Sequence, residues 1–177
     1  MHLQTDRLWI RKFQKEDETS VFTYTSDSKV MKYIPEGPFT KQGAADFIAE
    51  NSGESPEHFA VATIEENVLI GHITFFKYFG THTYEIGWVF NPDFYNRGFA
   101  TEAAQGVLDY GFEKMDLHRI IATCQPDNIA SYRIMEKIGM RKEGYHKQCI
   151  PNGDDWWDEV YYAVLKDEWE EAQRLKK

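Results

Sequence analysis

The sequence has 177 residues, of which 42% are apolar and 28% are charged, and its formal net charge is −9. This length and composition predict one folded domain, residues 1–177, and exclude a disordered chain. The acidic balance argues against nucleic acid as the main partner, since phosphate backbones require basic patches. It would suit a cationic partner, although most acidic proteins carry such charge only as a solvated surface.

The two cysteines, Cys124 and Cys149, form neither a disulfide framework nor a zinc-ligand pattern. We therefore expect a reducing compartment, the cytoplasm. The first residues carry no apolar signal core, and no stretch approaches the ~20 apolar residues that cross a membrane. The six histidines also lack ligand spacing, so we expect no membrane association and no metal.

The first half of the chain alternates between helical and extended patterns and ends in a meander of strands. Short polar or glycine-containing turns separate the meander strands, so the first two should form an antiparallel hairpin. In chain order we expect a strand over 7–13, a helix over 15–27, a helix after the N-cap Thr40, and strands over 58–64, 68–76 and 83–90.

The second half contains a helix between two strands, which favours a parallel crossover. We expect an α/β fold with a mixed, mostly antiparallel sheet of about seven strands, a central parallel pair and helices on both faces. The elements are a helix over 100–115, a strand over 119–123, a helix capped by Asn128, strands over 140–148 and 156–165 around a turn at 151–154, and a charged helix or tail over 166–177. The core face of the first helix is predicted to hold Ala100, Ala104, Val107, Leu108, Gly111 and Met115.

The stretch around Gly98 contains the predicted ligand site. The strand ending at Phe90 runs into a short turn that contains Gly98, and a helix follows at once. A turn of this kind exposes free backbone N–H groups at the positive end of a helix dipole, which favours an anion. The sequence therefore predicts a site for a phosphate-bearing ligand, although an ordinary strand-to-helix turn can also contain glycine.

The turn and several later motifs resemble the GNAT family of acetyl-CoA-dependent N-acetyltransferases. The family's phosphate motif, Gln/Arg-x-x-Gly-x-Gly/Ala, is matched at Gly98 and Ala100 and departs at Tyr95, which holds its first position. Further motifs resemble the RimJ/RimL-like branch of that family, and the resemblance covers about Thr5 to Leu165. These motifs are Thr5–Leu8, Tyr84–Gly87, Leu117–Ile120, Asn128–Ser131, Met135–Met140 and Glu143–Gly144.

The resemblance implies a single domain with a splayed central strand pair that binds acetyl-CoA as acetyl donor. The strand before the turn would hold the pantetheine arm, and an amide such as that of Val89 would polarise the acetyl carbonyl. Asn128 would also contact this arm, beside its role as a helix cap. The implied cofactor-binding residues are Trp88, Val89, Phe90, Tyr95, Asn96, Arg97, Gly98, Phe99, Ala100, Thr101 and Asn128.

Two residues are the candidate catalytic groups. Glu85, on the strand before the turn, is the candidate base or amine anchor, because partial burial would raise its pKa; a solvent-facing carboxylate is the plain alternative. The resemblance implies Ser131 as the candidate partner of the leaving thiolate, with Tyr132 as its rival. Asp158 and Glu159 are the alternative carboxylates.

The expected reaction is acetyl transfer to a primary amine, such as the N-terminal α-amine of a ribosomal protein. Polyamines and aminoglycoside-like amines are alternative acceptors, and a CoA-binding sensor without turnover is the alternative function. The loops at 33–40 and 149–157 should line the acceptor side. The aromatic residues of the last strands make a homodimer a candidate assembly.

Overall fold

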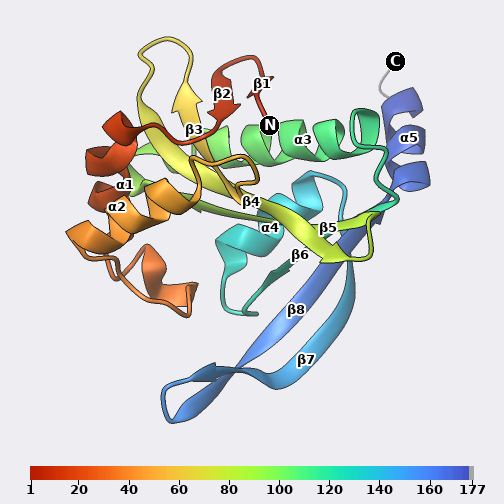
Figure 1. Cartoon of the computed structure of the whole chain (residues 1–177). Coiled ribbons are helices and arrows are strands. Elements are labelled where there is room, and N and C mark those ends of the chain that lie inside the picture. The colour runs from red at the N-terminus through yellow and green to blue at the C-terminus, as the bar shows by residue number, and fades with distance from the viewer. Residues whose placement is uncertain (176–177) are drawn as a thin grey trace. The chain divides into compact units, whose positions relative to one another are not determined.

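The protein has the predicted α/β fold with a mixed sheet, as the computed structural model of residues 1–175 shows (Figure 1). The sheet has eight strands in the order β1-β2-β3-β4-β5-β6-β8-β7, and β5 and β6 form its parallel pair. The eighth, unpredicted strand is β1, which is only two residues long. The elements are β1 (Leu3–Gln4), β2 (Leu8–Arg11), α1 (Glu18–Thr25), α2 (Lys41–Glu50), β3 (His58–Thr63), β4 (Leu69–Phe79), β5 (Thr83–Phe90), α3 (Phe99–Glu113), β6 (Arg119–Cys124), α4 (Ile129–Lys137), β7 (Arg141–Asn152), β8 (Asp155–Leu165) and α5 (Lys166–Leu175).

The described chain forms two compact units. Unit 1 consists of Met1–Phe75 and Trp88–Val107, and unit 2 consists of Phe76–Gly87 and the residues from Leu108 onwards. The strands β4 and β5 and the helix α3 each contribute residues to both units.

Unit 1 is built on antiparallel strands. The strand β2 pairs with β1 on one side and with β3 on the other, and β3 pairs with β4 in the predicted hairpin. The helices α1 and α2 lie beside each other (Figure 1). Thr40 is the predicted N-cap of α2, since its hydroxyl accepts the Gly43 N–H at 3.0 Å. The core of this unit contains Phe13, Val21, Tyr24, Ala44, Ile48, Ala60 and Leu69.

Unit 2 is centred on β6, which pairs with the start of β5 and, along its whole length, with β8. Beyond β6, β8 continues with β7 as a two-stranded arm (Figure 1). The predicted turn over 151–154 is wrong in its first two residues, because Pro151 and Asn152 pair with β8. A proline is tolerated there because β7 is an edge strand. Of the two predicted forms, helix or tail, residues 166–175 adopt the helix α5, and residues 176–177 lie outside the described residues.

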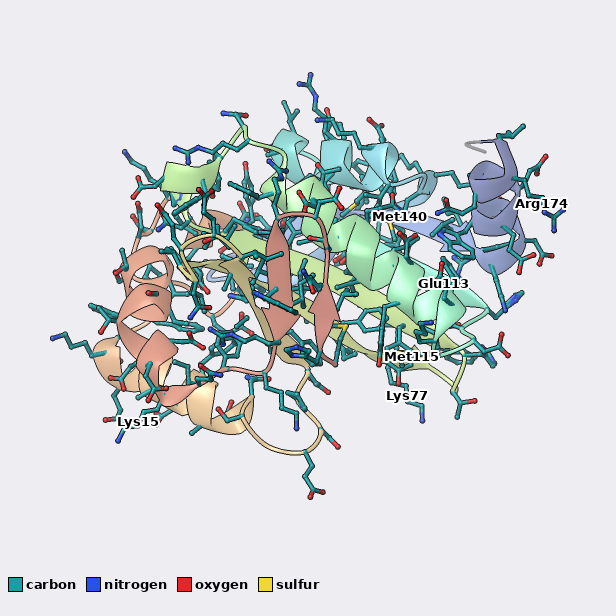
Figure 2. The ribbon with its side chains drawn as sticks, turned by 90° about the horizontal axis from the view of Figure 1, so that it is seen from above. Lys15, Lys77, Glu113, Met115, Met140 and Arg174 are labelled. Atoms are coloured by element: carbon teal, nitrogen blue, oxygen red, sulfur yellow. The ribbon has the colours of Figure 1, made fainter. Side chains whose placement is uncertain are left out.

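The helix α3 confirms most of its predicted core face. Ala104, Val107 and Leu108 are fully buried, whereas Ala100 is half-buried. Met115 is not part of this face, because α3 ends at Glu113 and Met115 follows that end (Figure 2). The predicted Gly111 is also buried, and the buried face further includes Ala103 and Phe112.

Candidate functional site

The phosphate turn, Tyr95–Thr101, joins β5 to α3 in unit 1. Asn96 and Gly98 have φ angles of 60° and 80°, in the left-handed region that glycine adopts freely and asparagine tolerates. The first bond of α3 runs from the Glu102 N–H to the Gly98 carbonyl at 2.9 Å. The N–H groups at positions 99–101 precede it and have no acceptor within the helix. The turn therefore presents backbone donors that suit a phosphate.

A side-chain network anchors this turn to the start of the chain. Glu102 Oε1 accepts hydrogen bonds from the Thr5 hydroxyl at 2.7 Å and the Arg7 N–H at 2.8 Å, and Oε2 accepts from Arg7 Nε at 2.6 Å. Arg7 also donates to the Arg97 carbonyl at 3.1 Å, and its guanidinium lies 4.4 Å from the centre of the Phe99 ring. Burial raises the pKa of Glu102, but these hydrogen bonds and the Arg7 charge outweigh it and hold the pKa below its usual value. Glu102 is therefore ionised at neutral pH.

The end of β5 lies very close to Gly71 of β4 in unit 1. A Cβ atom on Gly71 would lie 2.5 Å from the Val89 carbonyl oxygen and 2.8 Å from the Phe90 ring. The Val89 carbonyl therefore faces β4. In a regular strand, neighbouring residues turn their backbone groups to opposite edges. The backbone groups of Trp88 and Phe90 accordingly face the other edge of β5.

Glu85 lies in unit 2 at the last residue pair of the parallel strands. The pairing of β5 with β6 runs from Thr83↔Arg119 to Glu85↔Ile121. Glu85 is half-buried and accepts a hydrogen bond from the Thr123 hydroxyl at 3.1 Å. Burial raises the pKa of Glu85; the Thr123 hydrogen bond opposes this effect, and the Glu159 charge adds to it. A raised pKa makes a carboxylate a stronger proton acceptor.

Glu159 and Tyr161 interact electrostatically with Glu85 within unit 2, and Tyr78 bonds to Tyr161. The hydroxyl oxygens of Tyr78 and Tyr161 are 3.3 Å apart. Burial, the hydrogen bond to Tyr78 and the charges of Glu159 and Glu85 all raise the pKa of Tyr161. Tyr161 is therefore a neutral hydroxyl, able to donate or accept a hydrogen bond, beside an acidic pair.

The start of α4 holds the other predicted groups of unit 2. Asn128 is the confirmed N-cap of this helix, and its Oδ1 accepts the Ser131 N–H at 3.2 Å. Burial raises the pKa of the Cys124 thiol to about 11, although hydrogen bonds from the Ser131 hydroxyl and the Tyr132 N–H favour its ionised form. The Ser131 side chain thus contacts Cys124 at the end of β6. Tyr132, its rival, is half-buried.

Residues 7–141 match the model of the acetyltransferase (GNAT) domain. The chain belongs to the GNAT family of acetyltransferases.

Its relatives include YnaD of Bacillus subtilis (strain 168), an uncharacterised N-acetyltransferase with 62% identity over 96% of this chain and 99% of YnaD. The crystal structure of a GNAT-family acetyltransferase from Bacillus anthracis has a TM-score of 0.92 and 60% identity, covering 94% of this chain and 99% of that one. The ribosomal protein uS5-alanine N-acetyltransferase of Escherichia coli (strain K12) is 27% identical over 74% of this chain and 63% of that enzyme.

The GNAT structure brings together part of the predicted site in each unit. In unit 1, the phosphate turn follows directly from Trp88–Phe90. In unit 2, Glu85 has a defined partner in Thr123 and is not a solvent-facing carboxylate. The alternative carboxylate Asp158 instead bonds the Tyr145 hydroxyl and the Gln148 N–H on the β7–β8 arm. The roles assigned to these residues stay predictions.

Sequence reasoning missed Thr123 and Tyr161 near Glu85 in unit 2, and it missed the Arg7–Glu102 pair at the phosphate turn in unit 1. Thr123 is 38 positions from Glu85, and Arg7 is 95 positions from Glu102. Residue spacing carries no signal for such distant pairs. The motif Thr5–Leu8 carries part of the family resemblance, and in the fold its Thr5 and Arg7 side chains bond to Glu102 of α3.

Proposed function

We propose that the protein transfers an acetyl group from acetyl-CoA directly to a primary amine, and that residues 1–177 act as one catalytic domain. The family match over residues 7–141 supports the class of reaction. The observation that carries the proposal is Glu85, a half-buried carboxylate of raised pKa at the point where β5 and β6 stop pairing.

The donor would be held through backbone groups. The free N–H groups of the phosphate turn suit the pyrophosphate of CoA. The direction of the Val89 carbonyl favours Trp88 and Phe90 over Val89 as the backbone groups that pair with pantetheine. Capping uses only Oδ1 of Asn128, so its side-chain amide group remains suited to the same arm.

The chemistry requires no acetyl-enzyme. The amine nitrogen attacks the thioester carbonyl, the C–S bond breaks, and the CoA thiolate takes up a proton. Glu85 would accept the amine proton, directly or through water. Ser131 would donate a hydrogen bond to the departing sulfur, with Tyr132 as the rival. Cys124 is a poor covalent nucleophile, because its pKa of about 11 keeps the thiol protonated.

The acceptor we propose first is an N-terminal α-amine, as for the uS5-alanine enzyme, with polyamines and aminoglycoside-like amines as alternatives. Glu85 and Glu159 would favour a cationic amine at this point. We propose a cytoplasmic location, to which the free thiols Cys124 and Cys149 are suited. Among the described residues, no helix is both long and apolar enough to span a bilayer.

The test is a screen for CoA thiol release with acetyl-CoA and three amine panels: ribosomal N-terminal peptides, polyamines and aminoglycosides. We expect release with at least one panel and acetylation of the amine, checked by mass spectrometry. Tight CoA binding without thiol release on any panel would instead favour a CoA-binding sensor without turnover.

A further inference from the structure

Glu102 presents an electrostatic problem for a pyrophosphate site. It lies in the first turn of α3, directly after the free N–H groups of the phosphate turn, and it is ionised. A carboxylate at a helix N-terminus competes with a bound anion for the same positive potential. Unless its charge is compensated, Glu102 opposes the binding of a phosphate at this turn.

Arg7 compensates this charge. Both oxygens of Glu102 are occupied by donors from the start of the chain: Oε1 by Thr5 and the Arg7 N–H, and Oε2 by the Arg7 guanidinium. Two guanidinium nitrogens, Nε and Nη2, each lie 2.6 Å from Oε2. The charge-assisted pair therefore neutralises the carboxylate and leaves neither of its oxygens without a donor.

The third contact of Arg7 acts on the backbone of the turn. Its Nη1 donates to the Arg97 carbonyl at 3.1 Å. In a trans peptide the C=O and the following N–H point in opposite directions, so the Gly98 N–H points away from the guanidinium. Rotation of this peptide is otherwise easy, because glycine accepts φ of either sign, and Gly98 has φ of 80°.

We propose that Arg7 is a positioning residue for the cofactor: it locks the Arg97–Gly98 peptide with its N–H toward the pyrophosphate and neutralises Glu102. This inference rests on the proposed function, because it assumes that the phosphate turn binds CoA. Arg7 acts through the turn and need not contact the cofactor itself.

The test compares two acetyl donors, acetyl-CoA and S-acetylpantetheine, which lacks the pyrophosphate. For R7Q we expect the Kd for CoA and the KM for acetyl-CoA to rise about tenfold or more, with kcat at saturating donor within about twofold of wild type. The kcat/KM for S-acetylpantetheine should not change. A general structural defect would lower activity with both donors.

Two further variants separate the neutralisation of Glu102 by Arg7 from the hydrogen bond by which Arg7 fixes the Arg97–Gly98 peptide. In R7Q/E102Q the uncompensated carboxylate is gone, so part of the CoA affinity should return. The variant R7K keeps the charge but not the planar guanidinium, so its affinity for CoA should lie between those of R7Q and wild type. The control K12Q removes a half-buried cation in the same unit, whose bond goes to the Gly53 carbonyl at 2.6 Å. Its Kd for CoA and its KM for acetyl-CoA should equal those of wild type.

The outcomes are distinguishable. If wild type binds no CoA, the proposed function fails before any variant is measured, and this inference fails with it. If wild type binds CoA and R7Q binds it equally well, only the inference fails. Equal losses with both donors, together with a lowered unfolding temperature, would overturn it as well, because Arg7 would then be a structural residue only.

Discussion

The Thr123 hydroxyl donates a hydrogen bond to the Glu85 carboxylate at 3.1 Å, where the parallel strands β5 and β6 end their pairing. This contact distinguishes Glu85 from the other carboxylates of unit 2. It stabilises the ionised form of a group that burial and Glu159 push toward the neutral form. The balance of these effects sets the pH at which Glu85 can accept a proton.

The variant E85Q should therefore bind CoA as wild type does and lose catalysis. Loss of a general base typically lowers kcat by ~10²–10⁴-fold. Calorimetry gives the affinity for CoA, and thiol release gives kcat. The matched control is E159Q, which removes the neighbouring carboxylate and should lower kcat much less. A kcat for E85Q within threefold of wild type would exclude Glu85 as the base.

The variant T123V should shift the acidic limb of the pH–rate profile upward. It removes the hydrogen bond that lowers the Glu85 pKa and changes the side-chain volume little. Glu85 is then protonated up to a higher pH, so activity should appear only at higher pH. The maximal kcat/KM, reached above that limb, should change less. The measurement is kcat/KM between pH 5 and 9. An unshifted limb would mean that another group limits activity at low pH.

Ser131 and Tyr132 can be separated by removing one hydroxyl at a time. If Ser131 serves the leaving thiolate, S131A should lower kcat on the order of tenfold to a hundredfold, whereas Y132F should stay near wild type. The two variants are measured with the same donor and amine. The opposite pattern would assign the role to Tyr132.

The half-buried His58 and the buried His72 should make unit 1 sensitive to acid. Burial lowers the pKa of His58 to about 4, although the charge of Glu36 raises it. Burial and the nearby His58 also hold the pKa of His72 well below its usual value. Each histidine protonates more readily in the unfolded chain. Stability is therefore complete above the unfolded pKa near 6.5 and falls as the pH drops toward 4.

For His58 alone this loss is on the order of 3 kcal/mol. Urea unfolding at several pH values measures it, and H58Q should flatten the dependence, whereas the change H2Q at an exposed position should not. A free energy of unfolding that stays constant from pH 7 to 4 would contradict the burial effect.

The variant G71A should disturb the end of β5. Its new methyl group would lie 2.5 Å from the Val89 carbonyl oxygen, and a backbone atom in a paired strand cannot move freely. We expect a loss of about 1–3 kcal/mol and weaker CoA binding, because Val89 and Phe90 must shift. The control G53A has no neighbouring atom within 4 Å of its new methyl. Equal stability of the two variants would contradict this prediction.

Local patterns were sufficient for much of the fold. The strand over 83–90 has its predicted bounds, because alternating β-branched and aromatic residues follow a glycine turn. The caps at Thr40 and Asn128 were predictable because each bonds an N–H only three residues away. The crossover through α3 followed from the element order and the right-handed connection rule.

Features that depend on residues far apart in the sequence could not be predicted from local patterns. The strand β1 has two residues and exists through its pairing with β2. Two residues are too few for a hydrophobic periodicity to predict a strand. Pro151 reads as a turn residue, yet its partner Trp156 holds it in an edge strand. The raised pKa of Glu85 depends on Thr123 and Glu159, which only the folded sheet brings near.

The Arg7–Glu102 pair has a consequence for how the protein folds. It joins positions separated by 95 residues, so a large loop must close before this contact forms, and loop closure is entropically costly. The phosphate turn is a short local segment, but its final conformation depends on the arrival of the N-terminal strand. We expect competence for the cofactor to be acquired late in folding, after the antiparallel strands of unit 1 have paired.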